Sequence, residues 1–183
     1  MILLFLANGF EEVEALTPLD LLRRAGDQVR TVGIGGKRVI GAHGIMVEAD
    51  LDEAEIPEES PEMVILPGGM PGAANLNAST TVERVLARTE KSGGILAAIC
   101  AAPMVLGRLG YLRGRRAVCY PGFEDQLTGA RVEPGAGVVR DANVVTAEGM
   151  GVAFSFGLEL VAALHGQEAA DRIRASVMAP KVN

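Results

Sequence analysis

Residues 93–107 read GGILAAICAAPMVLG, with Cys100 between an apolar run and a proline. A continuous apolar run, here residues 94–99, is typical of a parallel strand buried on both faces of a sheet. Pro103 suits the first turn of a helix, so Cys100 stands where a buried strand gives way to a helix. Small alanines surround the thiol, as a nucleophile elbow requires. The stretch predicts an α/β fold with Cys100 at the carboxyl end of a central strand, where such sheets bind ligands.

The rest of the chain alternates between strand and helix patterns. Residues 1–7 predict a strand, 11–25 a helix closed by Gly26, and 28–34 a second strand. The later patterns predict a hairpin or crossover over 39–50, a strand over 63–66, a helix over 80–91, a helical segment after Cys100, an extended pair over 138–146 and a helix over 152–165. We expect a doubly wound, mostly parallel sheet with helices on both faces, in a single domain over residues 1–183.

The composition limits the classes of partner. The chain carries a net charge of −6 and its 17 Lys and Arg residues are spread along the sequence, so we expect no nucleic-acid partner. No apolar run approaches the ~20 residues that cross a bilayer, so we expect no membrane partner. The apolar start lacks a basic region and the chain has only two cysteines, which together favour a cytoplasmic protein with free thiols.

Glu14 is an acid in an apolar context. A helical wheel of residues 11–25 places Glu12 on the polar arc and Glu14 among the apolar residues of the other arc. Burial would raise the pKa of Glu14, so that the neutral acid donates a hydrogen bond near neutral pH. In the alternative, Thr17 is an N-cap and Pro18 opens the helix, which leaves Glu14 in a solvated loop. The buried version places Glu14 at the same edge of the sheet as Cys100.

Cys100 needs several hydrogen-bond donors if its thiol is to be ionised. A helix dipole contributes ~0.3–1 kcal/mol, less than the ~1.4 kcal/mol that corresponds to one pKa unit. The backbone N–H groups of Ala101 and of the turn at Gly68 and Gly69 would add donors, as would a protonated Glu14. These donors predict a lowered pKa for the Cys100 thiol. In the alternative, Cys100 is a small core residue and the glycines only form a tight turn.

Other motifs carry less chemistry. The glycines of residues 33–36 resemble part of a dinucleotide fingerprint, but another extended segment follows them, so we expect no nucleotide cofactor. His43 lies in a turn and either reaches the cleft or faces water, whereas His165 is interpreted as a surface residue at a helix end. Cys119 is predicted to be a packed strand residue and not a resolving thiol. The two cysteines and two histidines show no metal-ligand spacing, so no metal site is predicted.

Three segments together resemble a known family: ANGFEEVE over 7–14, LPGGMPGAANL over 66–76 and AAICAAP over 97–103. They resemble the ThiJ/PfpI superfamily, in its DJ-1-like branch, and the resemblance runs nearly end to end. It implies a flavodoxin-like sandwich, of the kind shared with class I glutamine amidotransferases, that is usually a homodimer. It also implies that Cys100 is the nucleophile, that Glu14 is its protonated partner, and that Gly69 and Ala101 are the amide donors.

The same resemblance implies an activity. The leading expectation is cofactor-independent detoxification of reactive carbonyls, as in glyoxalase III or deglycase members, with methylglyoxal converted to lactate by Cys100 and Glu14. The first alternative is an oxidative-stress sensor or chaperone that acts through oxidation of Cys100. The second is a cysteine hydrolase that uses His43 as its base.

Two segments depart from the family pattern. Tyr120, a possible pocket residue, stands where some members have a histidine near the cysteine. Residues 147–152 read AEGMGV where many members have Ser-Arg-Gly-Pro-Gly-Thr. Cys100 is also followed by alanine instead of the histidine found in protease-like members, which argues against peptidase activity.

Overall fold

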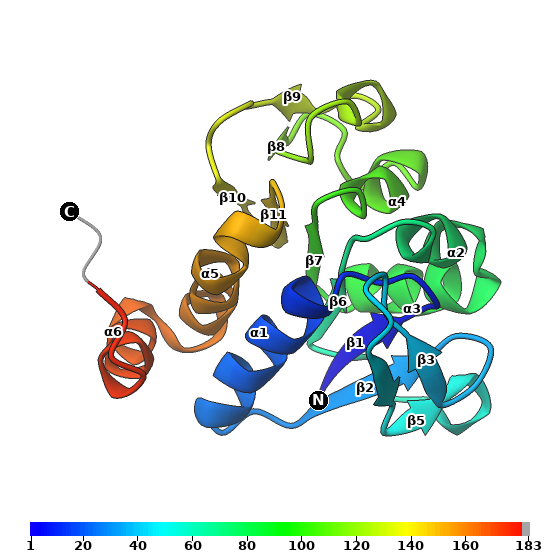
Figure 1. Ribbon diagram of the computed structural model, residues 1–183. Coiled ribbons are helices and arrows are strands. Elements are labelled where there is room, and N and C mark those ends of the chain that lie inside the picture. The colour runs from blue at the N-terminus through cyan, green and yellow to red at the C-terminus, as the bar shows by residue number, and fades with distance from the viewer. Residues whose placement is uncertain (181–183) are drawn as a thin grey trace.

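The computed structural model describes residues 1–180 and is built on a seven-stranded sheet with the order β10-β11-β7-β6-β1-β2-β5 (Figure 1). β10 runs antiparallel to β11, and all other neighbouring strands of this sheet are parallel. The strands of this sheet are β1 Ile2–Leu6, β2 Val29–Gly33, β5 Leu51–Asp52, β6 Met63–Leu66, β7 Ile95–Ile99, β10 Val138–Asp141 and β11 Val144–Ala147. The prediction of a doubly wound, mostly parallel sheet is confirmed.

Helices cover both faces of the sheet. α1 and α5 pack against each other on one face, α6 packs on α5, and α2, α3 and α4 lie on the other face (Figure 1). Their bounds are α1 Glu12–Arg24, α2 Gly72–Ala78, α3 Thr80–Lys91, α4 Pro103–Arg108, α5 Ala153–His165 and α6 Gln167–Ser176. No helix within residues 1–180 has the length and apolar character needed to cross a membrane.

The central strands form the core because both of their faces are apolar. Ile2 and Leu4 of β1 face the core under α1 and α5, whereas Leu3 and Phe5 face the opposite core. All four side chains are fully buried. Burying one such side chain contributes roughly 1.5–3 kcal/mol, so strands of this kind fix the centre of the sheet.

The remaining elements are short. They are β3 Arg38–Ile40, β4 Met46–Glu48, β8 Arg116–Ala117, β9 Arg131–Val132, and the 3-10 helices η1 Glu53–Glu55, η2 Glu124–Gln126 and η3 Met150–Val152. β3 and β4 form the antiparallel hairpin predicted over residues 39–50. The N–H of Ala42 in its turn donates to the carbonyl of Phe10 over 2.8 Å, so the hairpin is attached to the segment just before α1.

The helix predicted over residues 11–25 is α1, and it runs through Pro18. The alternative in which a helix begins at Thr17 is therefore wrong. α2 and α6 were not predicted from the sequence. α2 has the weak pattern GAANLNA, and α6 follows α5 with only Gly166 between them. The division of the chain into a single domain over 1–183 stays a prediction.

α1 and α5 approach closely at a glycine. A Cβ atom on Gly157 of α5 would lie 2.7 Å from Cδ1 of Leu21 and 3.0 Å from Cα of Pro18. Because real Cβ atoms do not come this close to their neighbours, only glycine allows the present spacing. The contact fixes the position of the helix that carries Glu14.

Candidate active site

Cys100 follows β7 directly and has a φ angle of +66°, in the left-handed region that residues other than glycine rarely adopt. Its N–H donates to the carbonyl of Ala147 over 2.9 Å, and its carbonyl accepts the N–H of Tyr120 over 2.8 Å. Backbone strain of this kind persists only where surrounding contacts hold it, and it concentrates at functional sites. The structure thus places Cys100 on the sharp turn between strand and helix that the sequence predicts.

Glu14 lies beside the thiol. Its side chain is 1% exposed, and its Oε2 accepts the N–H of Gly68 over 2.9 Å. The Glu14 carboxyl and the Cys100 thiol interact, so each shifts the pKa of the other. A Cβ atom on Gly68 would lie 2.6 Å from Glu14 Oε2 and 3.0 Å from Cys100 Sγ. Glycine at position 68 therefore keeps open the space that the acid and the sulfur share.

Burial changes the proton affinity of Glu14. The pKa of this carboxyl is raised from 4.5 to about 7, chiefly by burial and to a smaller extent by the negative charge of Glu11. Hydrogen bonds from Cys100 and from the backbone N–H groups of Gly68 and Met150 oppose the rise. Glu14 therefore changes its protonation state near neutral pH. The rise in its pKa agrees with the prediction from the sequence.

The thiol of Cys100 responds to the same surroundings. Burial raises its pKa from 9.0 to about 12, and the charge and hydrogen bond of Glu14 raise it as well, against the backbone N–H groups of Gly69 and Ala101. The prediction of a lowered thiol pKa is therefore wrong. Because the two groups interact strongly, their titrations belong to the pair. Of the two groups, the sulfur has the higher pKa, so it holds a shared proton in preference to Glu14.

The two glycines of the turn after β6 donate to different groups. Gly68 was predicted as an oxyanion donor, but its N–H is directed to Glu14 and not to the sulfur. The N–H groups directed to the sulfur are those of Gly69 and Ala101. These two amides are placed to stabilise negative charge on the sulfur or on an oxygen bound next to it.

The segment after β11 adds a contact that the sequence did not predict. The backbone N–H of Met150 lies near Glu14 and lowers the pKa of its carboxyl. A Cβ atom on Gly149 would lie 3.2 Å from Cδ2 of Tyr120 and 3.9 Å from Glu14 Oε1, so the Tyr120 ring borders the acid across this glycine. Tyr120 is 51% exposed. The pairing of Ala147 with Ile99 brings this segment to Cys100, and only that register would have revealed it.

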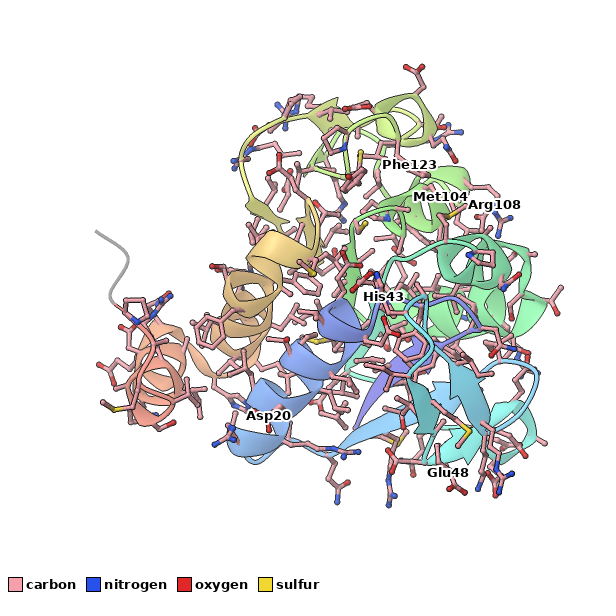
Figure 2. All side chains as sticks on the ribbon, viewed as in Figure 1. Asp20, His43, Glu48, Met104, Arg108 and Phe123 are labelled. Carbon is pink, nitrogen blue, oxygen red and sulfur yellow. The ribbon has the colours of Figure 1, made fainter. Side chains whose placement is uncertain are left out.

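His43 pairs with acids at the start of α1. Its Nδ1 lies 2.9 Å from Glu12 Oε2 and 3.5 Å from Glu11 Oε2, and its side chain is 66% exposed (Figure 2). Within residues 1–180 no hydrogen bond joins His43 to Cys100. The structure therefore gives His43 no role as a base for the thiol.

Glu12 corrects the helical wheel, which placed it on the polar arc. Its side chain is 4% exposed, because the turn of the β3–β4 hairpin covers it. Burial alone would raise its pKa, but hydrogen bonds from the His43 ring and from the backbone N–H groups of His43 and Ile45 lower it overall. Glu12 therefore stays ionised and ties the hairpin to α1.

The other singled-out residues lie away from the thiol–acid pair. His165 Nε2 lies 2.8 Å from Asp27 Oδ1 at the end of α5. Cys119 is 4% exposed, and burial raises its pKa to about 11. It lies after β8 and outside any strand, so its assignment to a strand is wrong although its packing is right. The glycines after β2 lead to β3 and not to a helix, as expected.

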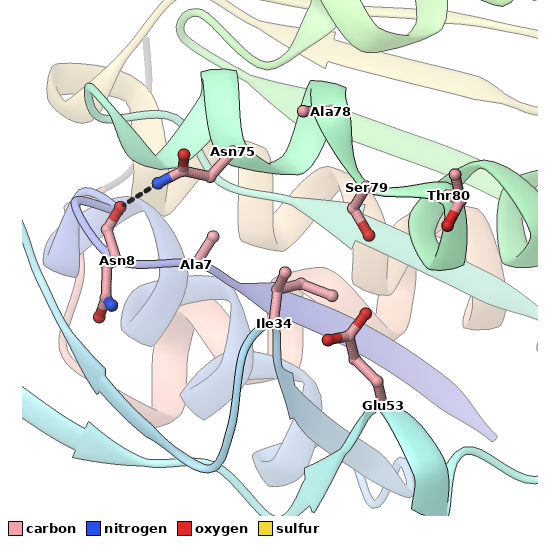
Figure 3. Close-up of a pocket in the computed structure, with 8 residues that line it drawn as sticks. All are labelled: Ala7, Asn8, Ile34, Glu53, Asn75, Ala78, Ser79 and Thr80. Atoms are coloured by element: carbon pink, nitrogen blue, oxygen red, sulfur yellow. Dashed lines mark hydrogen bonds between the residues drawn. The ribbon is translucent and has the colours of Figure 1, made fainter.

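A separate cavity of about 380 Å³ lies at the carboxyl ends of β1 and β2 (Figure 3). It is lined by Ala7, Asn8, Ile34, Glu53, Asn75, Ala78, Ser79 and Thr80. The side chain of Asn75 closes one end by donating to the carbonyl of Asn8 over 2.9 Å. Neither Cys100 nor Glu14 lines this cavity.

Comparison with known proteins identifies the family of this chain. Residues 1–163 match the DJ-1/PfpI family. The chain belongs to this family. The resemblance found in the three sequence segments is therefore confirmed, and the DJ-1/PfpI members below are similar over nearly the whole chain.

Two curated relatives have informative names. Protein dj-1beta of Drosophila melanogaster is 36% identical over 169 residues, which cover 91% of this chain and 90% of the relative. The Glutathione-independent glyoxalase DJR-1.2 of Caenorhabditis elegans is 33% identical over 159 residues, covering 86% and 84%. The solved structure described as Toxoplasma gondii DJ-1, oxidized, has a TM-score of 0.93 and 34% identity, and the match covers 98% of each chain. The family thus includes a relative named as a glyoxalase.

Proposed function

We propose that this chain is a glutathione-independent glyoxalase that converts methylglyoxal, or a related 2-oxoaldehyde, to the 2-hydroxy acid. The supporting observation is the shared space at Gly68, where a thiol sulfur and a buried acid face the same point. A group that exchanges its proton near neutral pH is the acid and base that such an isomerisation requires. The name of the nematode relative supports the same activity.

The proposed reaction uses the pair in sequence. Glu14 takes the proton of Cys100 as the sulfur adds to the aldehyde carbon, and then gives this proton to the aldehyde oxygen. The Glu14 carboxylate next removes the hydrogen on the former aldehyde carbon as a proton, which gives an enediolate, and returns it to the neighbouring carbon. The hydroxyl proton on the former aldehyde carbon passes to the oxygen of that neighbouring carbon. The product is a thioester of lactate on Cys100. Water hydrolyses the thioester, releasing lactate and restoring the thiol, so one water is consumed and no oxidant is needed.

The backbone groups support the charged stages. The N–H groups of Gly69 and Ala101 would stabilise the negative charge that passes from sulfur to oxygen as the aldehyde is attacked. Removing one such donor costs roughly 10²–10³ in rate in enzymes that use an oxyanion hole.

The direct test is consumption of methylglyoxal without glutathione, with lactate measured as the product. Cys100→Ser should lose turnover, because the serine hydroxyl is far less nucleophilic. Cys119→Ser is the matched control, since it also replaces a buried thiol but lies outside the pair, and it should retain turnover. Full activity in Cys100→Ser would overturn the proposal.

A second candidate is a sensor of oxidative stress, or a chaperone switched by oxidation. The similar Toxoplasma gondii structure is described as oxidized, and the donors around Cys100 would also hold the oxygens of a sulfinate. Mild peroxide followed by intact-mass measurement would then show addition of oxygen that Cys100→Ser abolishes. Oxygen uptake without any loss of stability or change in binding would argue for incidental oxidation.

The hydrolase alternative has less support. A cysteine hydrolase needs a base next to the sulfur, and the His43 ring is engaged by Glu12 and Glu11. Tyr120, at the position where some members carry a histidine, has no basic ring nitrogen. We therefore rank hydrolysis behind the other two functions.

We further propose a cytoplasmic homodimer. The apolar part of a groove beside α1 includes Val13, Leu16, Ile45 and Phe154, and Glu12, Asp20 and Arg24 also line the groove. Val13 and Ile45 are 42% and 55% exposed. A second copy of the chain would bury such a surface. Light scattering coupled to size exclusion should give the dimer mass, and Ile45→Glu should shift the protein towards the monomer. A wild-type monomer at micromolar concentration would contradict this assembly.

A further inference from the structure

A cavity lies at the amino-terminal end of β7, and Cys100 lies at the opposite end of the same strand. We call it the amino-end cavity, and its volume is about 190 Å³. Its lining residues are Glu90, Leu96, Gly110, Tyr111, Arg113, Arg115, Asn143 and Val144. Leu96 and Val144 are paired in β7 and β11 and are buried, so this part of the lining is rigid.

The lining of the amino-end cavity carries a net positive charge, although the protein as a whole is negatively charged. The cavity is lined by two arginines, Arg113 and Arg115, and by a single acid, Glu90, whereas the chain carries a net charge of −6. Within residues 1–180 neither guanidinium lies within 4.0 Å of a carboxylate oxygen. Two cations in one small cavity repel each other, and a bound anion would relieve that repulsion.

The backbone holds both arginines at the cavity. Arg115 Nη1 donates to the carbonyl of Asp141 over 3.1 Å. The stem of Arg113 lies against Gly129, where a Cβ atom would be 3.1 Å from Arg113 Cγ. Its Nε lies 3.5 Å from the position of a Cβ atom on Gly110. Backbone contacts thus restrict Arg115 at its guanidinium, and restrict Arg113, whose side chain is exposed, along its stem.

Two neutral donors complete the lining. Burial raises the pKa of Tyr111, so its hydroxyl keeps its proton and can donate. Asn143 Nδ2 donates to the carbonyl of Gly94 over 3.0 Å and has a second N–H to offer.

We propose that the amino-end cavity binds a compact oxyanion, a carboxylate or a phosphate group, between Arg113 and Arg115. Guanidinium groups match the geometry of both anions through paired N–H donors. The volume of about 190 Å³ leaves room for phosphate or a three-carbon acid. This site is separate from Cys100, and the proposal does not depend on the glyoxalase activity.

Two-dimensional ¹H–¹⁵N NMR of the full chain tests the proposal, with inorganic phosphate and lactate titrated separately in low-salt buffer. Saturable shifts of the amides at Gly110, Arg113 and Asn143 by either anion are expected, and the anion that binds tells phosphate from carboxylate. Sodium chloride at equal ionic strength is the control for general screening. The absence of saturable shifts with both anions, or shifts centred on Cys100 instead, would overturn the proposal.

Matched variants locate the binding. Arg113→Gln and Arg115→Gln should each weaken binding at least tenfold, since each removes a charged donor of paired hydrogen bonds to the anion. Arg84→Gln, on the exposed side of α3, should leave the affinity unchanged. Dispersed amide spectra show that each variant is folded, and Arg113→Lys tests whether paired donors are needed. If both cavity variants bound the anion with the affinity of the wild type, the site would be ruled out.

Discussion

The backbone N–H of Gly68 donates a 2.9 Å hydrogen bond to Oε2 of Glu14, so the turn after β6 holds an acid that α1 carries. The two residues are far apart in sequence, and the parallel pairing of β1 with β6 brings them together. The same glycine leaves room for Cys100. A single position without a side chain thus fixes the geometry of the thiol–acid pair.

Gly68→Ala should separate the pair. The new Cβ atom would lie 2.5 Å from Cys100 Cβ and 2.6 Å from Glu14 Oε2, so one of the side chains must move. Misplacement by about 1 Å can cost about 10²-fold in rate, and overpacking costs about 1–3 kcal/mol of stability. Methylglyoxal turnover and urea denaturation measure the two effects. Gly151→Ala, where no atom lies within 4 Å of the new Cβ, should leave both unchanged.

Glu14→Gln should uncouple reactivity of the thiol from turnover. The variant removes the negative charge that raises the pKa of Cys100, so alkylation by iodoacetamide at pH 7 should be at least as fast as in the wild type. An amide cannot exchange protons, and turnover should fall by about 10²–10⁴. Equal losses in both assays would show that Glu14 acts only on the thiol.

Glu14 should also make stability depend on pH. Its pKa is about 7 in the folded chain against 4.5 as the ordinary value, so the folded state binds more protons between these values. Stability should therefore fall as pH rises through this window. At ~1.4 kcal/mol for each pH unit, Glu14→Gln should exceed the wild type by up to about 3 kcal/mol above pH 7. Below pH 4.5 the difference should vanish in urea denaturation, whereas a difference independent of pH would contradict this assignment.

Met150→Pro should shift the pH–rate profile. Proline removes the N–H that lowers the pKa of Glu14, so that pKa should rise above about 7. The acid limb of turnover should move to higher pH by the same amount. The preceding Gly149 is extended and Met150 opens η3, so both positions accept the proline. An unchanged acid limb would show that another group controls it.

His43→Ala should leave methylglyoxal turnover within about twofold of the wild type, because surface changes away from the reacting groups have small effects. Glu12→Ala, in contrast, should destabilise the chain by roughly 1–3 kcal/mol, since it leaves backbone donors of the hairpin turn without an acceptor. Thermal unfolding and kinetics of the two variants separate the roles. Loss of turnover in His43→Ala would return the histidine to the mechanism.

The fold was predictable because buried parallel strands leave a strong signal. The apolar run before Cys100 is β7, and the periodic segment after the first strand is α1. α2 was missed because glycine, alanine and asparagine give little periodicity. Boundaries elsewhere were within a few residues, since glycine and proline mark the ends of these elements.

The site was predictable where one element determines it. The turn at Cys100 and the apolar face that carries Glu14 are local properties of β7 and α1. Tertiary contacts determine the rest. The hairpin buries Glu12, although the helical wheel places it on the polar arc. Met150 lies near Glu14 only because of the strand register in the sheet. The pKa of the thiol depends in part on the charge of Glu14, which another element carries.

Proline inside α1 leaves the peptide carbonyl of Glu14 without its usual helical donor, because that donor would be the N–H of residue 18. One hydrogen bond is therefore missing from the ladder of α1, at the residue that carries the buried acid. The position of this first turn of α1 depends on the close contact of Pro18 with Gly157 of α5. A larger side chain at Gly157 of α5 would push α1 away and displace the Glu14 carboxyl. A substitution far from Cys100 can therefore inactivate the protein.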